Sequence, residues 1–312
     1  MKRGLSGINA LIAIDKPLGI SSHGAISSVR HSLGEKRVGH AGTLDPEASG
    51  VLVVGVGQAT RLMGMLTAKT KGYKAQIQFG TQTTTDDKEG EVIAEAPVDS
   101  RLANREVAQI VLSSLIGPQM QTPPSFSAIS INGERAYKKA RAGEKVEIPA
   151  REIEILSADL AGIVSEDPLI WEADFCVSKG CYIRSIARDL GLQVGSYAHL
   201  AGLRRISSGP IDISQCKTLE EIESLGADNI DQVALDPVAA LGTCGIKILS
   251  EEELVYLKQG RRIRCGGFKQ PYGEDGRVCM VRDGKLYGVW RVEGPFLRAE
   301  VNFIDGISGV RL

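Results

Sequence analysis

One carboxylate set among small residues is the part of this chain best suited to chemistry. Residues 39–52 read GHAGTLDPEASGVL, so Asp45 is flanked by small side chains and followed directly by Pro46. Proline fixes φ and removes a backbone donor, and glycines let another molecule approach the backbone closely. The apolar run at 51–56 predicts a buried strand. We therefore expect a rigid loop that presents a single acid to a docked partner.

An ordinary turn is the simpler interpretation of these residues, and their spacing alone favours it, because Asp-Pro dipeptides and glycines are common in turns. The whole string is more specific. It closely resembles GHTGTLDPLATGVL, the signature of the TruB family of tRNA pseudouridine synthases. The resemblance implies that Asp45 is the essential catalytic residue and that Gly42 and Thr43 lie at the substrate.

Four further motifs carry the same resemblance. Residues 15–22 (DKPLGISS) look like the family's DKPxGxTS opening, and residues 71–73 (KGY) match its K-x-Y motif. Residues 178–185 (SKGCYIRS) are similar to its SKGTYIRS motif, and residues 201–205 (AGLRR) match the Leu-Arg-Arg segment that follows. The order and spacing of these motifs agree with the family across residues 11–210.

The resemblance implies a reaction in which the N1–C1′ bond of a uridine breaks and the turned base is rejoined through C5, without metal, redox step or other cofactor. The carboxylate must stay ionised in a dry pocket, although burial raises the pKa of an aspartate unless a cation lies nearby. We assign that cation to Arg184, whose planar fork suits a bidentate pair with Asp45. Asp45 would then attack C1′ or C6, or abstract a ribose proton, and the sequence leaves these alternatives open.

Three more residues receive base-handling roles from the resemblance. Tyr73 would stack on the base and its phenol could help to remove the C5 proton, while Leu203 would form the apolar floor of the pocket. A uridine in a folded RNA loop must be flipped out, at a cost of roughly a few kcal/mol, and His40 would fill the vacated stack. Outside these motifs, a tyrosine or leucine in such a place is an ordinary core residue, and a lone histidine is usually structural.

Positive charge gathers around the motifs although the whole chain has a formal net charge of −1. Residues 178–205 contain five Lys and Arg and one acid, and residues 245–312 contain twelve Lys and Arg against nine Asp and Glu. Local patches decide phosphate contacts because salt screens charges beyond ~8–10 Å, although such patches are often merely solvated faces. The side chains that we assign to phosphate contacts are Lys16, Lys71, Lys179, Arg204 and Arg205.

Several positions depart from the family strings. Glu47 replaces leucine and adds a negative charge beside a predicted RNA-binding loop. The other departures are Ala41 and Ser49 for threonine, Thr84 for aspartate, Phe126 for tyrosine and Ser130 for lysine. They bear on RNA affinity rather than on the reaction, because the three predicted catalytic residues are all present.

Hydrophobic periodicity predicts an α+β protein, and the resemblance implies the pseudouridine synthase fold with a mixed, largely antiparallel sheet. Strands are predicted at 11–14, 51–56, 73–79, 169–177, 278–281, 286–292 and 297–301, and helices at 23–33, 58–68, 104–116, 182–192 and 219–225. Ser22 is the predicted cap of the first helix, and Gly34 its end.

The chain divides into two predicted domains. A catalytic domain spans residues 1–244, and within it the irregular segment 121–144 resembles the family's RNA-gripping insertion. Residues 245–312 alternate short β-like runs with glycine turns, which predicts a small β-rich domain that weakly resembles a PUA-like RNA-binding domain.

Composition argues against several other classes of protein. The apolar stretches are too short to cross a bilayer, and the N-terminus lacks a signal-peptide pattern. The six cysteines are scattered without the spacing of a zinc site, so we expect neither metal nor disulfide. These features predict a cytoplasmic protein without membrane contact, and we expect a monomer.

The resemblance therefore implies that the chain modifies the uridine at position 55, in the T-arm loop of tRNA. An RNA chaperone that grips the T arm without catalysis is the alternative in the binding class. An aspartyl phosphotransferase is a second alternative, although such enzymes usually carry another acid two residues on together with Mg²⁺ ligands. Glu47 takes that position here, but no accompanying motif completes the set.

Overall fold

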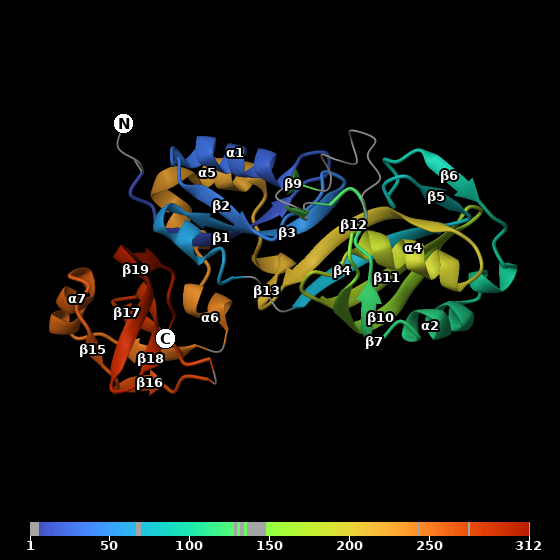
Figure 1. The fold of residues 1–312 in the computed structure, drawn as a ribbon. Helices are drawn as coiled ribbons and strands as arrows, with labels where there is room; N and C mark the ends of the chain where they lie inside the picture. The colour runs from blue at the N-terminus through green and yellow to red at the C-terminus, as the bar shows by residue number, and fades with distance from the viewer. Residues whose placement is uncertain are drawn as a thin grey trace. The chain divides into compact units, whose positions relative to one another are not determined.

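The chain folds into two compact units, and the second is inserted into the sequence of the first (Figure 1). The computed structural model describes residues 6–66, 70–127, 148–242, 244–273 and 275–311, together with the backbone of 130–131 and 134–135. The first unit comprises residues 1–68 and 208–312, and the second comprises residues 69–207. The predicted domain boundary at residue 244 falls inside the first unit, ahead of its C-terminal sheet, and stays a prediction.

The first unit opens with a small antiparallel sheet covered by helices. Its elements are β1 (Ala10–Lys16), α1 (Ser22–Leu33), β2 (Val38–Ala41), β3 (Ala48–Val56), η1 (Gly57–Leu62), β13 (Ile211–Asp212), η3 (Ile213–Gln215), α5 (Leu219–Asn229), η4 (Ile230–Val233) and α6 (Pro237–Leu241). Both β1 and β2 pair antiparallel with β3. In β1, Ile12 and Ile14 lie on one face, and Leu11 and Ala13 lie on the other, because successive side chains of a strand point to opposite faces. All four are buried, so both faces of β1 are covered.

The two faces of β1 belong to different hydrophobic clusters. Ile12 and Ile14 pack with side chains of α1 and α5 such as Ile26 and Ile222. Leu11 and Ala13 pack instead with residues of the C-terminal sheet. Strand β1 therefore lies between two hydrophobic clusters of the first unit.

Helix α1 ends where the sequence predicted, but its cap is one residue earlier. The hydroxyl of Ser21 accepts the backbone N–H of Gly24 at 3.0 Å, so Ser21 is the N-cap, and the prediction of Ser22 is wrong. Ser22 is buried and bonds elsewhere. Gly34 ends the helix at φ +58°, in the left-handed region that glycine adopts without strain.

The C-terminal part of the first unit is a six-stranded sheet with strand order β15-β19-β18-β17-β14-β16. Its elements are β14 (Gly245–Ile248), α7 (Glu251–Lys258), β15 (Ile263–Arg264), β16 (Phe268–Gln270), β17 (Arg277–Arg282), β18 (Lys285–Glu293) and β19 (Phe296–Ser308). Strand β14 runs parallel to β17, and the other pairs are antiparallel. In β17, Cys279 and Val281 pack toward β1, and Val278 and Met280 pack in a cluster with α7.

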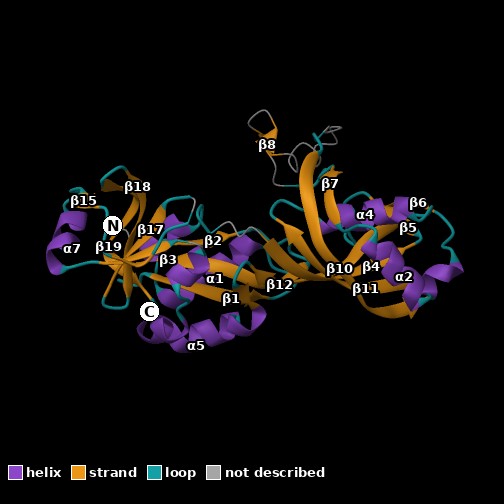
Figure 2. Cartoon of the chain, turned by 90° about the horizontal axis from the view of Figure 1, so that it is seen from below, coloured by secondary structure: helices purple, strands orange, loops and turns teal. Residues whose placement is uncertain are grey.

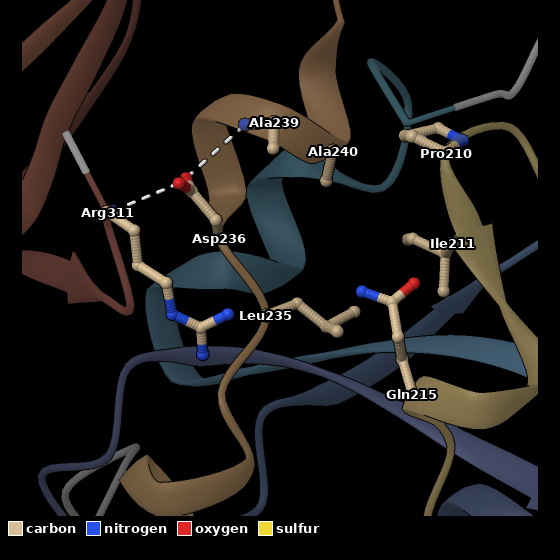
Figure 3. A pocket seen from close by; sticks show the side chains of 8 residues that line it. All are labelled: Pro210, Ile211, Gln215, Leu235, Asp236, Ala239, Ala240 and Arg311. Carbon is tan, nitrogen blue, oxygen red and sulfur yellow. Dashed lines mark hydrogen bonds between the residues drawn. The ribbon is translucent and has the colours of Figure 1, made fainter.

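The end of the chain is bonded to the segment before α6. Ser308 donates its hydroxyl to Asp231 at 2.6 Å, and the backbone N–H of Arg311 donates to Asp236 at 3.0 Å. Asp236 also accepts the backbone N–H of Ala239 at 3.3 Å (Figure 3). Asp236 and Arg311 line a cavity of about 250 Å³. None of the predicted site residues lines this cavity.

The second unit is a sheet with strand order β12-β4-β11-β10-β7. Its elements are β4 (Thr70–Phe79), β5 (Thr81–Thr83), β6 (Val92–Glu95), η2 (Ser100–Ala103), α2 (Arg105–Ser113), β7 (Gly117–Gln121), β8 (Ser130–Ile131), β9 (Glu134–Arg135), β10 (Arg151–Glu166), β11 (Leu169–Ser178), α4 (Ile183–Gln193) and β12 (Ala198–Ser208). Helix α2 packs against β10 (Figure 2), where Gln109 accepts the backbone N–H of Leu160 at 2.8 Å. Trp171 is fully buried and meets Phe79 edge-on at 4.6 Å between ring centroids.

The predicted α+β class with largely antiparallel sheets and a β-rich C-terminal part is confirmed. Every predicted strand lies within or closely matches an observed strand, and the helices at 23–33, 104–116, 182–192 and 219–225 are present with shifted ends. The predicted helix at 58–68 is wrong, because the described residues there form only the short 3-10 helix η1. The long strands β10 and β12 were not predicted.

Candidate active site

The backbone around Asp45 is anchored on both sides in the first unit. The hydroxyl of Ser22 accepts the backbone N–H of Leu44 at 2.8 Å and donates to its carbonyl at 2.9 Å. On the other side, the backbone N–H of Gly19 donates to the carbonyl of Pro46 at 2.9 Å. Both neighbours of Asp45 are thus held by the segment that opens α1. Asp45 itself is half-buried at the tip of the loop.

Lys16 belongs to this loop support. Its ammonium donates to the carbonyls of Pro17 and Ile20, each at 2.7 Å, and of Pro46 at 3.3 Å. An ammonium has three donors, and the Lys16 residue is 0% exposed. The predicted contact of Lys16 with RNA phosphate stays a prediction. Lys16 ties the 17–20 loop to the Asp45 loop.

The other predicted residues of the first unit lie on the same strand and loop. His40 is half-buried on β2, where it pairs with Val54 of β3. Gly42 has a φ of +79°, which favours glycine, and Thr43 is exposed. The structure therefore brings these three residues together with Asp45 along one stretch of chain, and their roles toward a substrate stay predictions.

Tyr73 lies on β4 in the second unit and is 7% exposed. It pairs with Phe175 of β11 and alternates with polar residues, so its side chain lies on the buried side of the strand. The preceding Gly72 donates its N–H to the hydroxyl of Ser207 at 3.1 Å. A Cβ atom at this glycine would come within 2.6 Å of that hydroxyl, so the close approach needs glycine. Tyr73 is therefore fixed by packing.

Arg184 lies in the first turn of α4 and is 6% exposed. One terminal nitrogen donates to the carbonyl of Thr85 at 3.2 Å and lies 3.4 Å from a carboxylate oxygen of Asp87. The other donates to the carbonyl of Phe126 at 3.0 Å. The guanidinium is thus held by two loops of its own unit. Asp45 belongs to the other unit, so the predicted Asp45–Arg184 pair stays a prediction.

Asp87 is a site residue that sequence reasoning missed. It is buried, and its second carboxylate oxygen accepts the hydroxyl of Thr85 at 2.5 Å and the backbone N–H of Glu89 at 3.1 Å. These bonds fix the carboxylate that faces Arg184. The sequence signal that could have found Asp87 is the pair of adjacent acids Asp86 and Asp87 in the polar turn at 81–90. Both are buried in the structure, and two neighbouring buried carboxylates need cations nearby.

The remaining predicted phosphate contacts of the second unit differ in exposure. Arg205 is 0% exposed, and its predicted contact with RNA phosphate stays a prediction. Lys71 is half-buried, and burial, followed by the charge of Arg205, lowers its pKa to about 8. Lys179 is exposed and Arg204 is half-buried, as a phosphate contact requires. Leu203, the predicted floor of the pocket, is half-buried on β12.

The predicted insertion at 121–144 is described only in part. Residues 128–129, 132–133 and 136–144 lie outside the described residues, as does the side chain of Ser130. Residues 122–127 are described, and Phe126 is half-buried. This short segment reaches Arg184 through the Phe126 carbonyl.

Comparison with known families decides the assignment. The description "TruB family pseudouridylate synthase (N terminal domain)" matches residues 30–183, and "tRNA pseudouridylate synthase B C-terminal domain" matches residues 184–239. The chain belongs to the TruB family. It is therefore a pseudouridylate synthase, an isomerase. The two matches meet between Ile183 and Arg184, at the start of α4.

Curated relatives of this TruB protein align over nearly its whole length. A protein named tRNA pseudouridine synthase B from Thermobifida fusca is 41% identical over 285 residues, which are 89% of this chain and 95% of the relative. A protein of the same name from Geobacillus thermodenitrificans is 38% identical over 279 residues, which are 88% of this chain and 91% of the relative.

Solved structures share the fold of this TruB protein at lower identity. A chain from the crystal structure of a Cbf5-Nop10-Gar1 complex aligns with a TM-score of 0.69 at 21% identity, over 95% of this chain and 85% of that one. A chain from the structure of an H/ACA RNP bound to a substrate RNA containing 2′-deoxyuridine aligns with a TM-score of 0.68 at 20% identity, over 95% and 85%. These matches confirm the predicted pseudouridine synthase fold.

Two further features of the described residues concern metal ligands and membrane-spanning helices. Within the described ranges, no group of three His, Cys, Asp or Glu side chains is placed to hold a metal ion. Among the helices that the structure describes, none is long and apolar enough to cross a membrane.

Proposed function

We propose that this enzyme isomerises uridine to pseudouridine at position 55 in the T-arm loop of tRNA, with Asp45 as its essential residue. The name of the relatives, tRNA pseudouridine synthase B, supports tRNA as the substrate. The observation that carries the proposal is the loop that presents Asp45. Its neighbour Leu44 is bonded to buried Ser22, and its neighbour Pro46 is bonded to Gly19 and to buried Lys16, while the Asp45 side chain is half-buried. We further propose that the enzyme acts as a cytoplasmic monomer.

The reaction needs a fixed carboxylate and no net change of atoms. The N1–C1′ bond breaks, the base turns, a C5–C1′ bond forms, and the proton that leaves C5 is balanced by one gained at N1. Asp45 attacks C1′ or C6, or removes a ribose proton, and all three roles need its carboxylate close to the sugar and base. Fixing a reacting group in advance removes much of the entropic cost of the reaction, which is what the anchored loop supplies.

Arg184 supplies the positive charge that keeps Asp45 ionised in this proposal. Asp87 and two carbonyl groups hold the guanidinium within its own unit, so it does not have to reorganise when a substrate binds. Asp87 therefore acts through Arg184.

A flipped uridine would meet the remaining predicted residues. We assign base stacking to Tyr73 and the apolar floor to Leu203, and we assign the filling of the vacated stack to His40. Tyr73 is fixed by its place in the sheet, which suits a stacking surface. Gly42 and Thr43 leave room for the sugar and phosphate, because they are small and Thr43 is exposed.

RNA outside the loop would contact exposed cations. We propose that exposed Lys179 and half-buried Arg204 contact RNA phosphates. Between α7 and β15, exposed Arg261 lies over the ring of Tyr256 at 4.1 Å and exposed Arg262 lies near the ring of Phe296 at 5.8 Å. Stacked arginines present a pre-ordered charge, so we propose that this PUA-like part grips an RNA stem.

The direct test is the product itself. Purified protein is incubated with a T-arm hairpin that contains the uridine, and pseudouridine is mapped by its carbodiimide adduct. A second hairpin with cytidine at that position is the control. Modification at the single uridine supports the proposal, and buffer-level modification refutes it.

The T-arm chaperone remains the alternative of a different class. Its effect on tRNA folding would not depend on the Asp45 carboxylate, whereas pseudouridine formation would. Asp45→Asn separates the two, because the change removes the charge and keeps the size of the side chain. Unaltered chaperone effect with no isomerase activity would show that both functions exist.

A further inference from the structure

Arg188 in α4 joins two loops of the second unit. One terminal nitrogen donates to the carboxylate of Asp86 at 2.9 Å, and the other donates to the carbonyl of Thr122 at 2.9 Å. Its Nε donates to Asp189 on the same helix, also at 2.9 Å. All three nitrogens of the guanidinium are thus bonded to protein acceptors. Its side chain is 17% exposed.

Arg184 joins the same two loops one helical turn earlier. Its bonds reach the carbonyls of Thr85 and Phe126. Residues 85 and 86 belong to one loop, and residues 122 and 126 belong to the other. Because residues four apart lie on one face of a helix, the two arginines form parallel bridges between the acidic loop and segment 122–127.

The two bridges differ in what they hold. Arg184 bonds to backbone carbonyls and faces Asp87, whereas Arg188 pairs at 2.9 Å with Asp86, which is 7% exposed and has a φ of +60°. This φ is strained for a residue other than glycine, so the loop needs support from its surroundings. Burial raises the pKa of Asp86, and the charge of Arg188 opposes that rise.

Other contacts show that the second loop depends on α4. The hydroxyl of Ser185 donates to the same Thr122 carbonyl at 2.9 Å. Thr122 thus receives two bonds from α4, and Phe126 receives one from Arg184. The carbonyls that orient Arg184 therefore belong to loops that Arg188 also holds.

We propose that Arg188 is a positioning residue that acts through Asp86 and Thr122 to hold the two loops that orient Arg184. This rests on the proposed function, in which Arg184 supports the catalytic carboxylate. Since each nitrogen of Arg188 is bonded to a protein acceptor and its side chain is only 17% exposed, we assign it to positioning rather than to a phosphate contact. Its loss therefore slows the chemical step and leaves RNA affinity nearly unchanged.

The test measures the rate of one turnover and the tRNA affinity separately. For Arg188→Ala we expect the single-turnover rate to fall roughly 10-fold or more, because small displacements of a catalytic group are costly, while the Kd for tRNA changes by less than about 2-fold. Arg188→Lys should lie between, since a lysine lacks the fork that reaches both loops. A weaker Kd at an unchanged single-turnover rate would overturn the proposal, as would an unchanged rate and Kd.

Two further variants separate positioning from general damage. Asp86→Asn removes the partner charge, and its effect on the rate should not add to that of Arg188→Ala, because both break one bridge. Asp189→Asn is the matched control, since Asp189 touches Arg188 from the exposed side and should leave the rate near that of the unmodified protein. Fully additive losses for Asp86 and Arg188 would contradict the bridge.

Folding and function are checked in the same series. Thermal unfolding reports whether each variant is folded, and if Arg188→Ala does not fold, the slower rates expected of Arg188→Lys and Asp86→Asn decide the matter. If the unmodified protein forms no pseudouridine, the proposed function fails. If the unmodified protein is active and these variants match it, the role of Arg188 fails.

Discussion

The lysines near the predicted site differ in which groups their ammonium donors bind. Lys16 gives its donors to backbone carbonyls and so holds the loop that carries Asp45, although its motif alone suggested a phosphate contact. Lys179 is exposed and remains available to a ligand. The sequence can locate a cation near a site, but burial decides whether that cation serves the fold or the substrate.

Lys71 predicts a specific dependence of stability on pH. Its folded pKa of about 8 lies below the ordinary value of 10.5, so the folded protein releases this proton before the unfolded chain does. Its contribution to the free energy of unfolding must therefore increase as the pH rises from about 8 to 10.5. Lys71→Met should remove that increase. Denaturant titrations of both proteins across this pH range measure it, and parallel curves would contradict the prediction.

Asp87 tests how Arg184 is oriented. Asp87→Asn keeps an oxygen for Thr85 and Glu89 but removes the charge that faces Arg184 at 3.4 Å. We expect the single-turnover rate to fall roughly 10- to 100-fold with little change in unfolding temperature, because the fault is one of placement. Glu89→Gln removes one exposed charge from the same turn and is the control. A normal rate for Asp87→Asn would show that the carbonyl groups alone hold Arg184.

At the scale of elements, α1 does more than cover the sheet. Its first residues bond to the loop that carries Asp45, so helix and loop form one support. The periodic spacing of Ile26, Val29 and Leu33 was enough to predict the helix. The bond between Ser22 and Leu44 was not predictable, because it joins residues that are 22 positions apart.

Two neighbouring serines separate support of the loop from support of the helix. Ser22→Ala leaves the buried N–H of Leu44 without its acceptor, so we expect a loss of ~1–3 kcal/mol in unfolding free energy together with a slower single-turnover rate. Ser21→Ala removes the helix cap and should cost about 0.5–2 kcal/mol with a normal rate per folded molecule. Denaturant unfolding and single-turnover assays give both quantities. Equal rates for the two variants would contradict a role of Ser22 in presenting Asp45.

Several elements were beyond sequence reasoning for identifiable reasons. Strand β12 reads AHLAGLRRISS, whose arginines interrupt the alternation of a half-buried strand, and Arg205 is nonetheless fully buried. The apolar Gln58–Ala68 stretch has a helical period, but only a 3-10 helix forms among its described residues. Local pattern predicts elements whose burial is regular, and it fails where polar side chains are buried by distant partners.

At the scale of the whole molecule, sequence order and spatial units differ. The sequence predicted a boundary at residue 244, whereas the compact units place residues 208–312 with the N-terminal residues. The reason is packing, because Leu11 and Ala13 share a hydrophobic cluster with Val301 and Phe303 of β19. Alternation in β1 showed two buried faces but did not show which segment covered each face.

The end of the chain predicts a stability effect that is separate from catalysis. Asp236→Ala removes the cap of α6 and the acceptor of the Arg311 N–H, so we expect a loss of about 0.5–2 kcal/mol or slightly more. Asp236→Asn keeps one acceptor oxygen for the cap of α6 and replaces the oxygen that accepts the Arg311 N–H by an NH2 group, so it should lose less stability than the alanine variant. Thermal unfolding measures the difference, and hydrogen exchange at Val310 should increase with both variants. Equal stability of Asp236→Asn and the unmodified protein would show that the C-terminal residues are held by packing alone.

The central claim is that one anchored carboxylate performs the isomerisation. The most direct measurement of it is single-turnover pseudouridine formation in tRNA by the unmodified protein and by Asp45→Asn. Binding of tRNA by both proteins is measured in parallel. The account predicts product at position 55 from the unmodified protein and none from the variant, while both bind tRNA with similar Kd. Pseudouridine formed by Asp45→Asn at a rate near that of the unmodified protein would contradict it.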